Sequence, residues 1–342
     1  MRLVTLTLLV MMSVLKVWGQ DSLTRAEKRQ QRIERIRAVH NKVDSALLKR
    51  YWKTKYDTSY ISRTPKKLTL RLRPNLSGSF IYNFGDFNGT KVHTTLRSDV
   101  RSTLSIGFSY IGITAAFSLN PGKWSGRNKD YEINLNYYGR QFCAIASYQN
   151  TKTLSGIAEY AGQTVHVDKG HINMKMLNMS AYYVFNHRRF SYPAAMTQSY
   201  IQKRSAGSWL AGLSLQYTHI RTEDNMPATL PHLRMRTGHI GVGGGYAYNI
   251  VIRKRWMLHF SLLPTLVVAN IGDTHISGLE KDLKTGFPSG IITGHMAFIG
   301  NITPRYFVGC TAMGTGTFFN VSDVHINQSK WLARVFFGTR LF

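Results

Sequence analysis

The segment from Trp331 to Phe342 constrains the fold more than any other feature of the chain. Read at a spacing of two, it divides into an uncharged row and a row that contains Arg334 and Arg340. Successive side chains of a β-strand point to opposite faces, so one face of this segment suits a hydrophobic medium and the other does not. At about 3.3 Å per residue, the segment is long enough to cross a bilayer core at the usual tilt. It therefore predicts an amphipathic, membrane-spanning strand whose last residue is aromatic.

The same alternation recurs through the chain after Pro65. The clearest runs are 131–137, 142–148, 177–185, 209–217, 240–248 and 256–262. Weaker runs lie near 67–74, 77–84, 101–108, 111–119, 288–300 and 304–318. Closed membrane barrels favour even strand numbers. We therefore predict an all-β fold, an antiparallel transmembrane β-barrel of about 12 strands (10–14), preceded by a short basic helix.

Two further features favour a membrane barrel over a soluble sandwich. Aromatic residues such as Trp209, Trp256 and Trp331 gather at the ends of the runs, where a barrel carries its interfacial girdles. Many runs also have glycine on their second face. A secreted β-sandwich would alternate as well, and it stays open as the alternative fold.

Residues 1–19 have the pattern of a secretory signal peptide. Arg2 provides a positive start, residues 3–15 are mostly apolar, and small residues precede position 20. This order is typical of a cleaved export signal, and the apolar run is too short for a stable transmembrane helix. The sequence therefore predicts an exported protein.

A basic arm at 20–64 separates this predicted signal from the barrel domain at 65–342. Between positions 21 and 67 there are 14 Lys or Arg against 5 Asp or Glu. Apolar residues recur there at helical spacing, which predicts a basic helix of roughly 25 residues. These residues are Ile33, Ile36, Val39 and Val43. The apolar stripe is narrow, so a solvated helix and a docked helix both stay open.

The whole chain is strongly basic, with a formal net charge of +27. A charge of this size usually suggests nucleic acid as a partner. Export instead predicts no nucleic acid, and the expected partners are outer-membrane lipid and lipopolysaccharide. A small anionic or amphipathic ligand is a further expected partner. No cofactor is predicted. Cys143 and Cys310 lie within strand-like runs, where two buried thiols are favoured over one disulfide.

No motif in the chain indicates catalysis. A barrel hydrolase needs a nucleophile, a base and an orienting group that converge in space, and no such set is recognisable by spacing. His239, His259 and His295 all fall on predicted lumen-facing rows and would bind a metal if they converged. Because no short His-x-His or His-x-x-x-His spacing occurs, we favour separate histidines and predict no metal site.

The stretch from Phe190 to Ser208 is neither alternating nor helical, and it is the most distinctive part of the chain. It offers an aromatic ring, two amides and two adjacent cations within a short reach, groups that suit an anionic head group or a glycan. The candidate ligand-binding residues are Tyr192, Gln198, Gln202, Lys203 and Arg204. Two alternatives to this interpretation remain: the stretch folds inward and narrows the lumen, or it is an ordinary surface loop. Two other irregular stretches, 150–170 and 273–290, are predicted to be long extracellular loops without strands.

The motifs Tyr56–Tyr60, Ser191–Ala195 and Gln202–Ser208 resemble those of a group of Gram-negative envelope proteins, domain of unknown function 4421. The resemblance covers about 55–342. It implies an exported barrel of the outer-membrane type, and it brings no catalytic residues, substrate or activity.

Taken with the barrel pattern, these observations predict an outer-membrane protein with a structural, passive-transport or ligand-binding role and no catalytic activity. Two alternatives stay open. One is an outer-membrane barrel enzyme that acts on lipid or peptide, and the other is a secreted soluble β protein that binds glycan.

Overall fold

The computed structural model describes residues 25–52, 56–64, 66, 68–87, 89–110, 113–119, 130–225, 232–276, 285–321 and 323–341. The predicted signal peptide at 1–19 and the terminal Phe342 lie outside these residues. The chain forms two compact units, Met1–Thr54 and Lys55–Phe342.

The first unit contains one described helix, α2 (Arg25–Trp52), which confirms the basic helix that the sequence predicts. Three residues of its narrow apolar stripe, Ile33, Ile36 and Val39, are exposed. Among the described residues, no helix is both long and apolar enough to cross a membrane.

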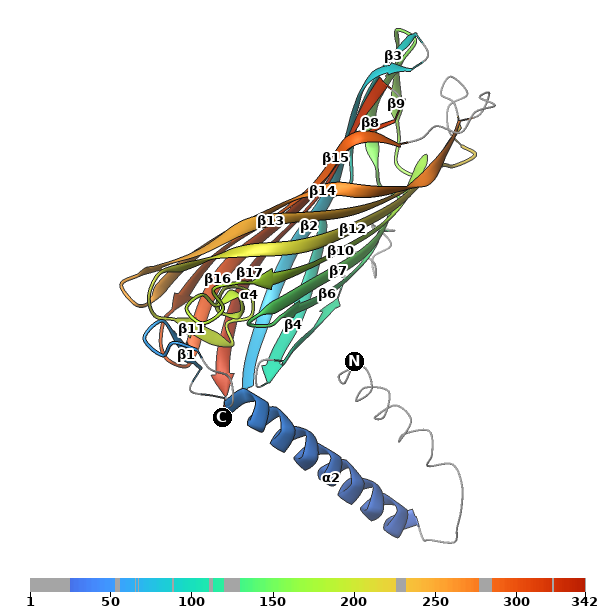
Figure 1. The fold of residues 1–342 in the computed structure, drawn as a ribbon. Helices are drawn as coiled ribbons and strands as arrows, with labels where there is room; N and C mark the ends of the chain where they lie inside the picture. The colour runs from blue at the N-terminus through green and yellow to red at the C-terminus, as the bar shows by residue number, and fades with distance from the viewer. Residues whose placement is uncertain are drawn as a thin grey trace. The chain divides into compact units, whose positions relative to one another are not determined.

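The second unit is a 15-stranded antiparallel sheet that curls into a barrel (Figure 1). Its first strands are β2 (Leu68–Phe87), β3 (Thr90–Arg97), β4 (Arg101–Tyr110), β5 (Ile113–Leu119), β6 (Tyr131–Tyr138) and β7 (Phe142–Thr151). A short hairpin, β8 (Ser155–Tyr160) and β9 (Gln163–Val167), follows. The sheet continues with β10 (Ile172–Val184), β12 (Ala206–Thr222), β13 (Leu233–Ile252), β14 (Trp256–Ile276), β15 (Thr285–Asn301), β16 (Tyr306–Val321) and β17 (Asp323–Leu341).

Twelve of the described strands form the wall, as the sequence predicts. They are β2, β4, β5, β6, β7, β10, β12, β13, β14, β15, β16 and β17. β3 continues the line of β4 along β2, and the β8–β9 hairpin pairs with β3 beyond the wall. The last strand, β17, pairs with the first, β2, from Leu341 opposite Leu68 to Asp323 opposite Asp86.

β2 is one long strand where the sequence analysis predicted two, at 67–74 and 77–84. Pro74 is the cause of that error, because proline normally ends a strand inside a sheet. Here the β17–β2 ladder passes from Asn75 to Leu72 without pairing the two residues between them. Proline has no N–H to donate, so the strand continues through a local gap in one ladder.

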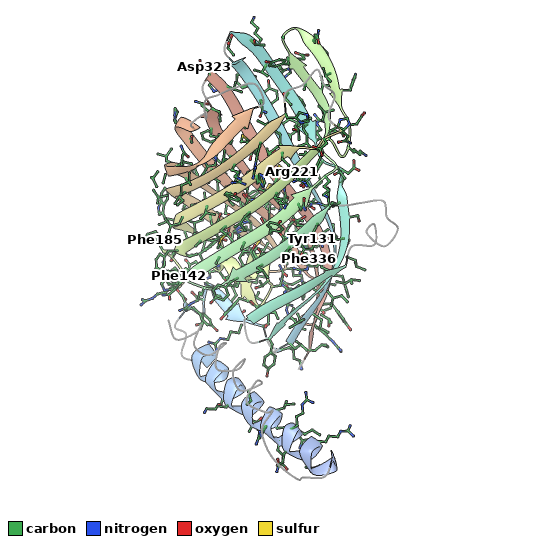
Figure 2. All side chains as sticks on the ribbon, turned by 90° about the vertical axis from the view of Figure 1, so that its right-hand side faces the viewer. Tyr131, Phe142, Phe185, Arg221, Asp323 and Phe336 are labelled. Carbon is green, nitrogen blue, oxygen red and sulfur yellow. The ribbon has the colours of Figure 1, made fainter. Side chains whose placement is uncertain are left out.

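The two faces of the wall follow the predicted alternation. On β17, Val335 and Phe337 are 61% and 51% exposed on the outer face, whereas Arg340 on the inner face is 1% exposed. Figure 2 shows Phe142 and Phe185 at one end of the barrel and Asp323 at the other. We call the end at which β2 begins and β17 finishes the terminal end, and the opposite one the far end.

Aromatic pairs, two of them stacked and two edge-to-face, lie on the outside of the terminal end, on strands that are neighbours in the wall. These pairs are Phe142–Tyr183, Trp209–Tyr246, Trp256–Phe298 and Tyr306–Phe337. Gly300 makes room for one of them, since a Cβ there would lie 2.3 Å from the ring of Trp256. An aromatic band of this kind is typical of a membrane–water interface.

Part of the predicted loop at 150–170 is the β8–β9 hairpin, so the expectation of no strands there was wrong. Its two strands are short, and the turn between them is formed by Ala161 and Gly162, both with positive φ (52° and 75°). Only the second of these is a residue type that favours this conformation, which is why the turn was not recognised.

The inside of the barrel has apolar layers at both ends. The layer at the terminal end includes Tyr138, Tyr182, Tyr192, Met257 and Phe307, and we call it the terminal cluster. The layer toward the far end includes Leu96, Met174, Ile220, Phe319 and Ile326, and we call it the far cluster. Cys143 is buried in the terminal cluster and Cys310 is exposed; both are free thiols.

Candidate ligand site in the barrel lumen

The connection between β10 and β12 folds into the barrel at the terminal end and forms a plug, residues 186–205. Its centre is the short helix α4 (Tyr192–Met196), all of whose residues are buried. Ser191 caps this helix by accepting a hydrogen bond from the Ala194 N–H (3.2 Å), and Pro193 sits in its first turn, where the missing N–H costs nothing. The distinctive stretch of the sequence is therefore an inward fold.

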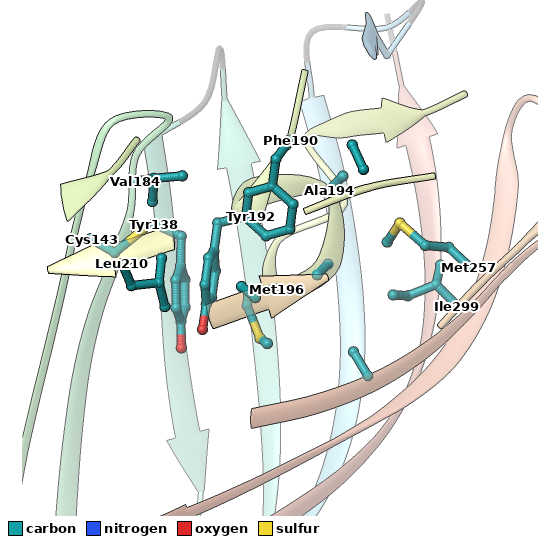
Figure 3. Packing of buried hydrophobic residues seen from close by; sticks show 14 of the residues in the cluster. Tyr138, Cys143, Val184, Phe190, Tyr192, Ala194, Met196, Leu210, Met257 and Ile299 are labelled. Carbon is teal, nitrogen blue, oxygen red and sulfur yellow. The ribbon is translucent and has the colours of Figure 1, made fainter. Parts of the chain in front are cut away.

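Tyr192 anchors the plug to the barrel wall. Its ring stacks on that of Tyr138 (Figure 3), and the ring centroids are 5.9 Å apart. Its hydroxyl lies 2.6 Å from Ser261 Oγ on β14 and 3.0 Å from His295 Nδ1 on β15. Ser261 Oγ and His295 Nδ1 are 3.2 Å apart, a spacing that a serine nucleophile and its base would also have. Both residues are buried, however, and both contact Tyr192. The cluster therefore holds a structural hydroxyl instead of presenting a nucleophile to solvent.

Gln202 connects the two ends of the plug. Its Oε1 accepts hydrogen bonds from the Ser191 N–H (3.0 Å) and from Asn249 Nδ2 on β13 (3.1 Å). Its Nε2 donates to the carbonyl oxygens of Arg189 (2.6 Å) and Arg204 (3.0 Å). All of the hydrogen-bonding capacity of this amide is used within the protein.

Lys203 and Arg204 are exposed at the end of the plug, where they contact the segment 56–64 that precedes the wall. A two-stranded sheet pairs β1 (Ile61–Arg63) with β11 (Tyr200–Gln202) in the plug. Lys203 Nζ donates to the Thr58 carbonyl (2.9 Å), and Arg204 lies over the ring of Tyr60 at 5.9 Å. The motifs that carry the family resemblance, although far apart in sequence, thus meet in one structure. We call residues 56–64, which pair with the plug there, the clamp.

The clamp also contains the half-buried Asp57. Hydrogen bonds from the side chain and backbone of Ser59, with a weaker contribution from Arg189, lower the pKa of Asp57 below its ordinary value. Its Oδ2 lies 3.4 Å from Arg189 Nε on the plug. This carboxylate is therefore charged at neutral pH and faces the basic side of the plug.

Gln198 is the one candidate residue that lines the main cavity. Its φ of 51° is left-handed, which is uncommon for a residue other than glycine. Its Nε2 donates to the Ala195 carbonyl (2.8 Å), and its Oε1 accepts from Arg71 Nη1 (3.2 Å) on β2. The Arg71 guanidinium also donates to the carbonyl of Thr197, so it holds this end of the plug.

A polar belt lies beyond the plug, and its centre is Glu132 on β6. The Glu132 carboxylate lies 3.2 Å from Arg101 Nη2 on β4 and 2.7 Å from Lys330 Nζ on β17. It also accepts hydrogen bonds from Ser77 Oγ (2.8 Å) and Asn134 Nδ2 (2.9 Å). These contacts cross between strands that are not neighbours, so side chains fill part of the lumen.

The belt continues on the opposite side of the lumen through amides. Gln216 of β12 lies 3.2 Å from Gln328 of β17, and Thr218 donates to the same Gln328 oxygen (3.1 Å). Because β12 and β17 are separated by four other strands, this bond joins two walls of the barrel across its interior.

A cavity of about 1000 Å³ is lined by plug residues 196–198, by residues of β2, β4 and β17, and by inward and outward residues of β6, β7, β10 and β12. Its cationic lining residues are Arg73 and Arg334, and its only carboxylate among the described lining residues is Glu132, which is already paired with two cations. Arg71, Arg73 and Arg334 are close enough to repel one another. Within the described part of the chain, no carboxylate forms an ion pair with any of the three.

Sequence reasoning placed Arg334 in the lumen but did not connect it with Arg73. The reason is topological: the two arginines lie on the first and last wall strands, and only the β17–β2 pairing brings those strands together. Alternation at a spacing of two indicates the face of a strand, but not which distant strand lies beside it.

The three histidines do not form a metal centre. His259 Nδ1 contacts Asn249 Oδ1 (2.7 Å), His295 contacts Tyr192, and His239 Nδ1 contacts Asn270 Oδ1 (2.8 Å). No group of three or more metal-binding side chains occurs among the residues that the structure describes.

A wall of antiparallel amphipathic strands, closed first to last and plugged from one end, defines an integral β-barrel of the outer-membrane type. The family model described as "Domain of unknown function (DUF4421)" matches residues 55–340, and the chain belongs to that family. Its range begins where the second compact unit begins, and it therefore includes the clamp, the plug and the wall. No curated protein matches the chain in sequence.

Three solved structures resemble the chain in their backbone fold. The outer membrane protease OmpT from Escherichia coli is 7% identical, with 82% of this chain and 98% of that chain covered and a TM-score of 0.44. The translocator domain of the autotransporter NalP from Neisseria meningitidis is 9% identical, with 92% and 96% covered and a TM-score of 0.32. The outer membrane protein OprG from Pseudomonas aeruginosa is 10% identical, with 82% and 99% covered and a TM-score of 0.26. A likeness of this degree extends no function to the chain.

Proposed function

We propose that the protein is a non-catalytic outer-membrane barrel that binds a small anionic or amphipathic molecule in its lumen, in a passive-transport or ligand-storage role. The observation that carries the proposal is the pair Arg73 and Arg334 on the wall of the main cavity, neither of which forms an ion pair with a carboxylate among the described residues, although Glu132 attracts Arg334 from a greater distance. Partly desolvated cations cost free energy unless they are paired, and a bound anion would offset that cost.

The remaining lining suits a molecule with both polar and apolar parts. Asn136, Ser105 and Gln198 supply neutral hydrogen-bonding groups, and Met196 and Phe336 supply apolar surface. The volume of about 1000 Å³ lies at the upper end of the range for small-molecule sites. Of the five residues predicted from sequence, we assign a direct ligand contact to Gln198 and a supporting role to Tyr192, Gln202, Lys203 and Arg204.

The binding test uses the full-length protein in phosphatidylcholine nanodiscs, titrated with 11-(dansylamino)undecanoic acid. We expect saturable binding, and we expect the double variant Arg73→Gln with Arg334→Gln to weaken it by about tenfold or more, because each charge-assisted hydrogen bond contributes about 1.5–3 kcal/mol. Arg221→Gln with Lys175→Gln removes the same charge from exposed far-end positions and should leave the affinity unchanged. Equal affinity in wild type and the Arg73/Arg334 variant would overturn the proposal.

The compartment is tested separately, by fractionation of cells that express the full chain. The amphipathic wall and the aromatic band support an outer-membrane location. We expect the protein in the outer-membrane fraction, with faster migration on unboiled than on boiled gels. Recovery of most of the protein in the soluble periplasmic fraction would contradict the proposal.

A further inference from the structure

The outer face of the wall carries an apolar span that ends at one row of residues toward the far end. On β12 the outward side chains are apolar from Trp209 to Tyr217. About 9–11 residues of a tilted strand cross a bilayer core, so this stretch reaches from one membrane interface to the other. Leu177 on β10 and Gly238 on β13 are opposite Tyr217 in the two ladders. The row formed by these three residues therefore marks the far-end boundary of the membrane-facing surface.

Basic residues occupy the next two outward positions beyond this boundary. Lys175, His219 and Arg236 form the first row across β10, β12 and β13. Arg221 and Arg234 are opposite each other in the second row, and Figure 2 shows Arg221 toward the far end. The four Lys and Arg side chains all act electrostatically on His219, so they lie close around it. We call these five residues the basic rim.

Most of the charge of the basic rim is not paired within the described part of the chain. Arg221 forms an ion pair with Glu223 at 3.1 Å. Lys175 and Arg234 form no ion pair with any described residue. The sequence of the connection from β12 to β13, residues 226–231, contains no acidic residue. Cations are thus available at the rim for a negatively charged partner.

His219 is at the centre of the basic rim. Its Nε2 is buried and has no hydrogen-bond partner among the described residues. A buried nitrogen without a partner costs free energy, and a hydrogen-bonding group brought by a ligand removes that cost. The described ladders place one acid beside the rim, Asp273 on β14, which is opposite Arg236. With this acid included, the rim keeps a net positive charge.

The chemistry of the basic rim suits a phosphate. Arg234 and Arg236 have planar guanidinium groups, whose paired N–H donors match phosphate oxygens. A phosphate monoester carries a charge of about −1.5 to −2, so one such group balances two of the cations. Like charges on adjacent strands repel one another, and a bound phosphate offsets that repulsion.

The position of the basic rim indicates that the phosphate belongs to a lipid. The exposed Met179 and Leu213 lie on the membrane side of the boundary row, on the outer faces of β10 and β12. A lipid whose acyl chains cover this surface brings its head group to the level of the cations. The rim extends over three strands, a width of about 10 Å at the usual strand spacing. This width fits a head group with two phosphates better than one with a single phosphate.

We propose that the basic rim binds the phosphates of a phosphorylated glycolipid, of the lipid A type, in the membrane leaflet at the far end. Arg234 and Arg236 bind one phosphate and Lys175 binds the other, while the acyl chains lie on the apolar span of β10 and β12. The rim lies outside the wall, whereas Arg73 and Arg334 lie inside it. This site is therefore separate from the proposed lumen site, and evidence against one is not evidence against the other.

The test measures lipid binding by the full-length protein in dodecyl maltoside, where membrane phospholipids do not compete. Bisphosphorylated lipid A is titrated, and native mass spectrometry counts the bound molecules. The rim variant is Arg234→Gln with Arg236→Gln. The control, Arg253→Gln with Lys254→Gln, removes the same charge from the turn between β13 and β14 at the terminal end. Heat-modifiable migration confirms that each variant is folded.

We expect saturable binding by the wild type, about tenfold weaker binding by the rim variant, and unchanged binding by the control. Lipid A without its phosphates should bind to the wild type as weakly as the bisphosphorylated lipid binds to the rim variant. Equal affinity of the wild type and the rim variant, or equal binding of the two lipids by the wild type, would overturn the proposal. Displacement of the lipid by an equimolar amount of inorganic phosphate would assign the site to the free anion and overturn the lipid as its ligand.

Discussion

At the scale of single residues, inner and outer side chains of one strand experience opposite environments although they are neighbours in the chain. Arg334 and Phe337 on β17 illustrate this contrast. Arg334 lines the cavity and donates through Nη1 to Met313 Sδ (3.6 Å), whereas Phe337 is exposed on the outside and stacks on Tyr306. Charge is accommodated at the first position and is costly at the second.

Val335→Arg, on the same outer face as Phe337 but further from the aromatic band, is therefore expected to destabilise the barrel by about 2–4 kcal/mol, the range for a charge placed toward the middle of the bilayer. Arg334→Gln should be tolerated far better, because the glutamine still faces the polar cavity. Urea unfolding of the purified protein in lipid vesicles, followed by loss of the heat-modifiable band, measures both effects. Equal damage from the two substitutions would mean that the faces are wrongly assigned.

Tyr192→Phe tests the anchor of the plug. The substitution keeps the ring stacked on Tyr138 but leaves Ser261 and His295 without their hydroxyl partner in a buried site, which costs about 1–3 kcal/mol. We expect a lower urea midpoint for the protein. Tyr248→Phe, on the exposed outer face, is the matched control and should have no effect; a similar loss in both would refute a specific role for the buried hydroxyl.

At the scale of elements, the plug depends on a few side chains that connect it to the wall and to the clamp. Gln202 alone contacts Ser191, Arg189, Arg204 and Asn249, and Gln198 meets Arg71. The wall strands are held by their own ladders and do not need these contacts. The plug should consequently be removable without loss of the barrel.

Replacing residues 198–204 with a Gly/Ser linker of equal length should leave a folded barrel with a detached plug. We expect the ionic conductance in planar lipid bilayers to rise, because the terminal end of the lumen opens. The matched control replaces residues 159–165 around the turn of the β8–β9 hairpin, which lies beyond the wall. If conductance, ligand binding and folding are all unchanged, the plug has no gating or binding role.

The alternation of side chains was enough to predict the wall, because the apolar and polar rows of each strand indicate which face meets lipid. The alternation was not enough at Pro74. Proline normally ends a strand, but here β2 continues through it because β2 pairs with β17 on both sides of this residue. The sequence marked the plug as a distinctive stretch, and an inward fold was one of the predicted alternatives. The contacts that the plug makes with the wall were not predicted. Asn249, His295 and Arg71 reach it from three separate strands, and no spacing in the sequence indicates that convergence.

At the scale of the whole barrel, the two ends differ in charge. The described turns and loops at the terminal end carry Arg140, Arg188, Arg189, Lys203, Arg204, Arg253, Lys254, Arg255 and Arg305, with Asp57 as the paired acid. The described turns at the far end carry Lys152 and Lys169 together with Asp168, Glu223 and Asp224, although Lys175, Arg234 and Arg236 lie near one another on the strands there. The described turns and loops are thus more basic at the terminal end than at the far end.

We expect the terminal end to lie in the periplasm and the far end to face the outside of the cell. An epitope inserted between Ala161 and Gly162, in the β8–β9 turn, should bind antibody on intact cells. The same epitope between Lys254 and Arg255 should bind only after the outer membrane is permeabilised. Antibody binding to the second insertion on intact cells would reverse the orientation.

The pairing of the first wall strand with the last also has a consequence for the order of assembly. Leu68 meets Leu341, so the wall cannot close until nearly the whole chain has been synthesised and exported. The loop-closure entropy of so long a segment is large, which makes this ladder an unfavourable starting point for folding. The plug lies between β10 and β12, which pair locally as a hairpin around it, and it can dock on them while the sheet is still open. The plug is therefore in place before β2 pairs with β17. Refolding kinetics should show burial of Tyr192 before burial of residues at the β2–β17 junction.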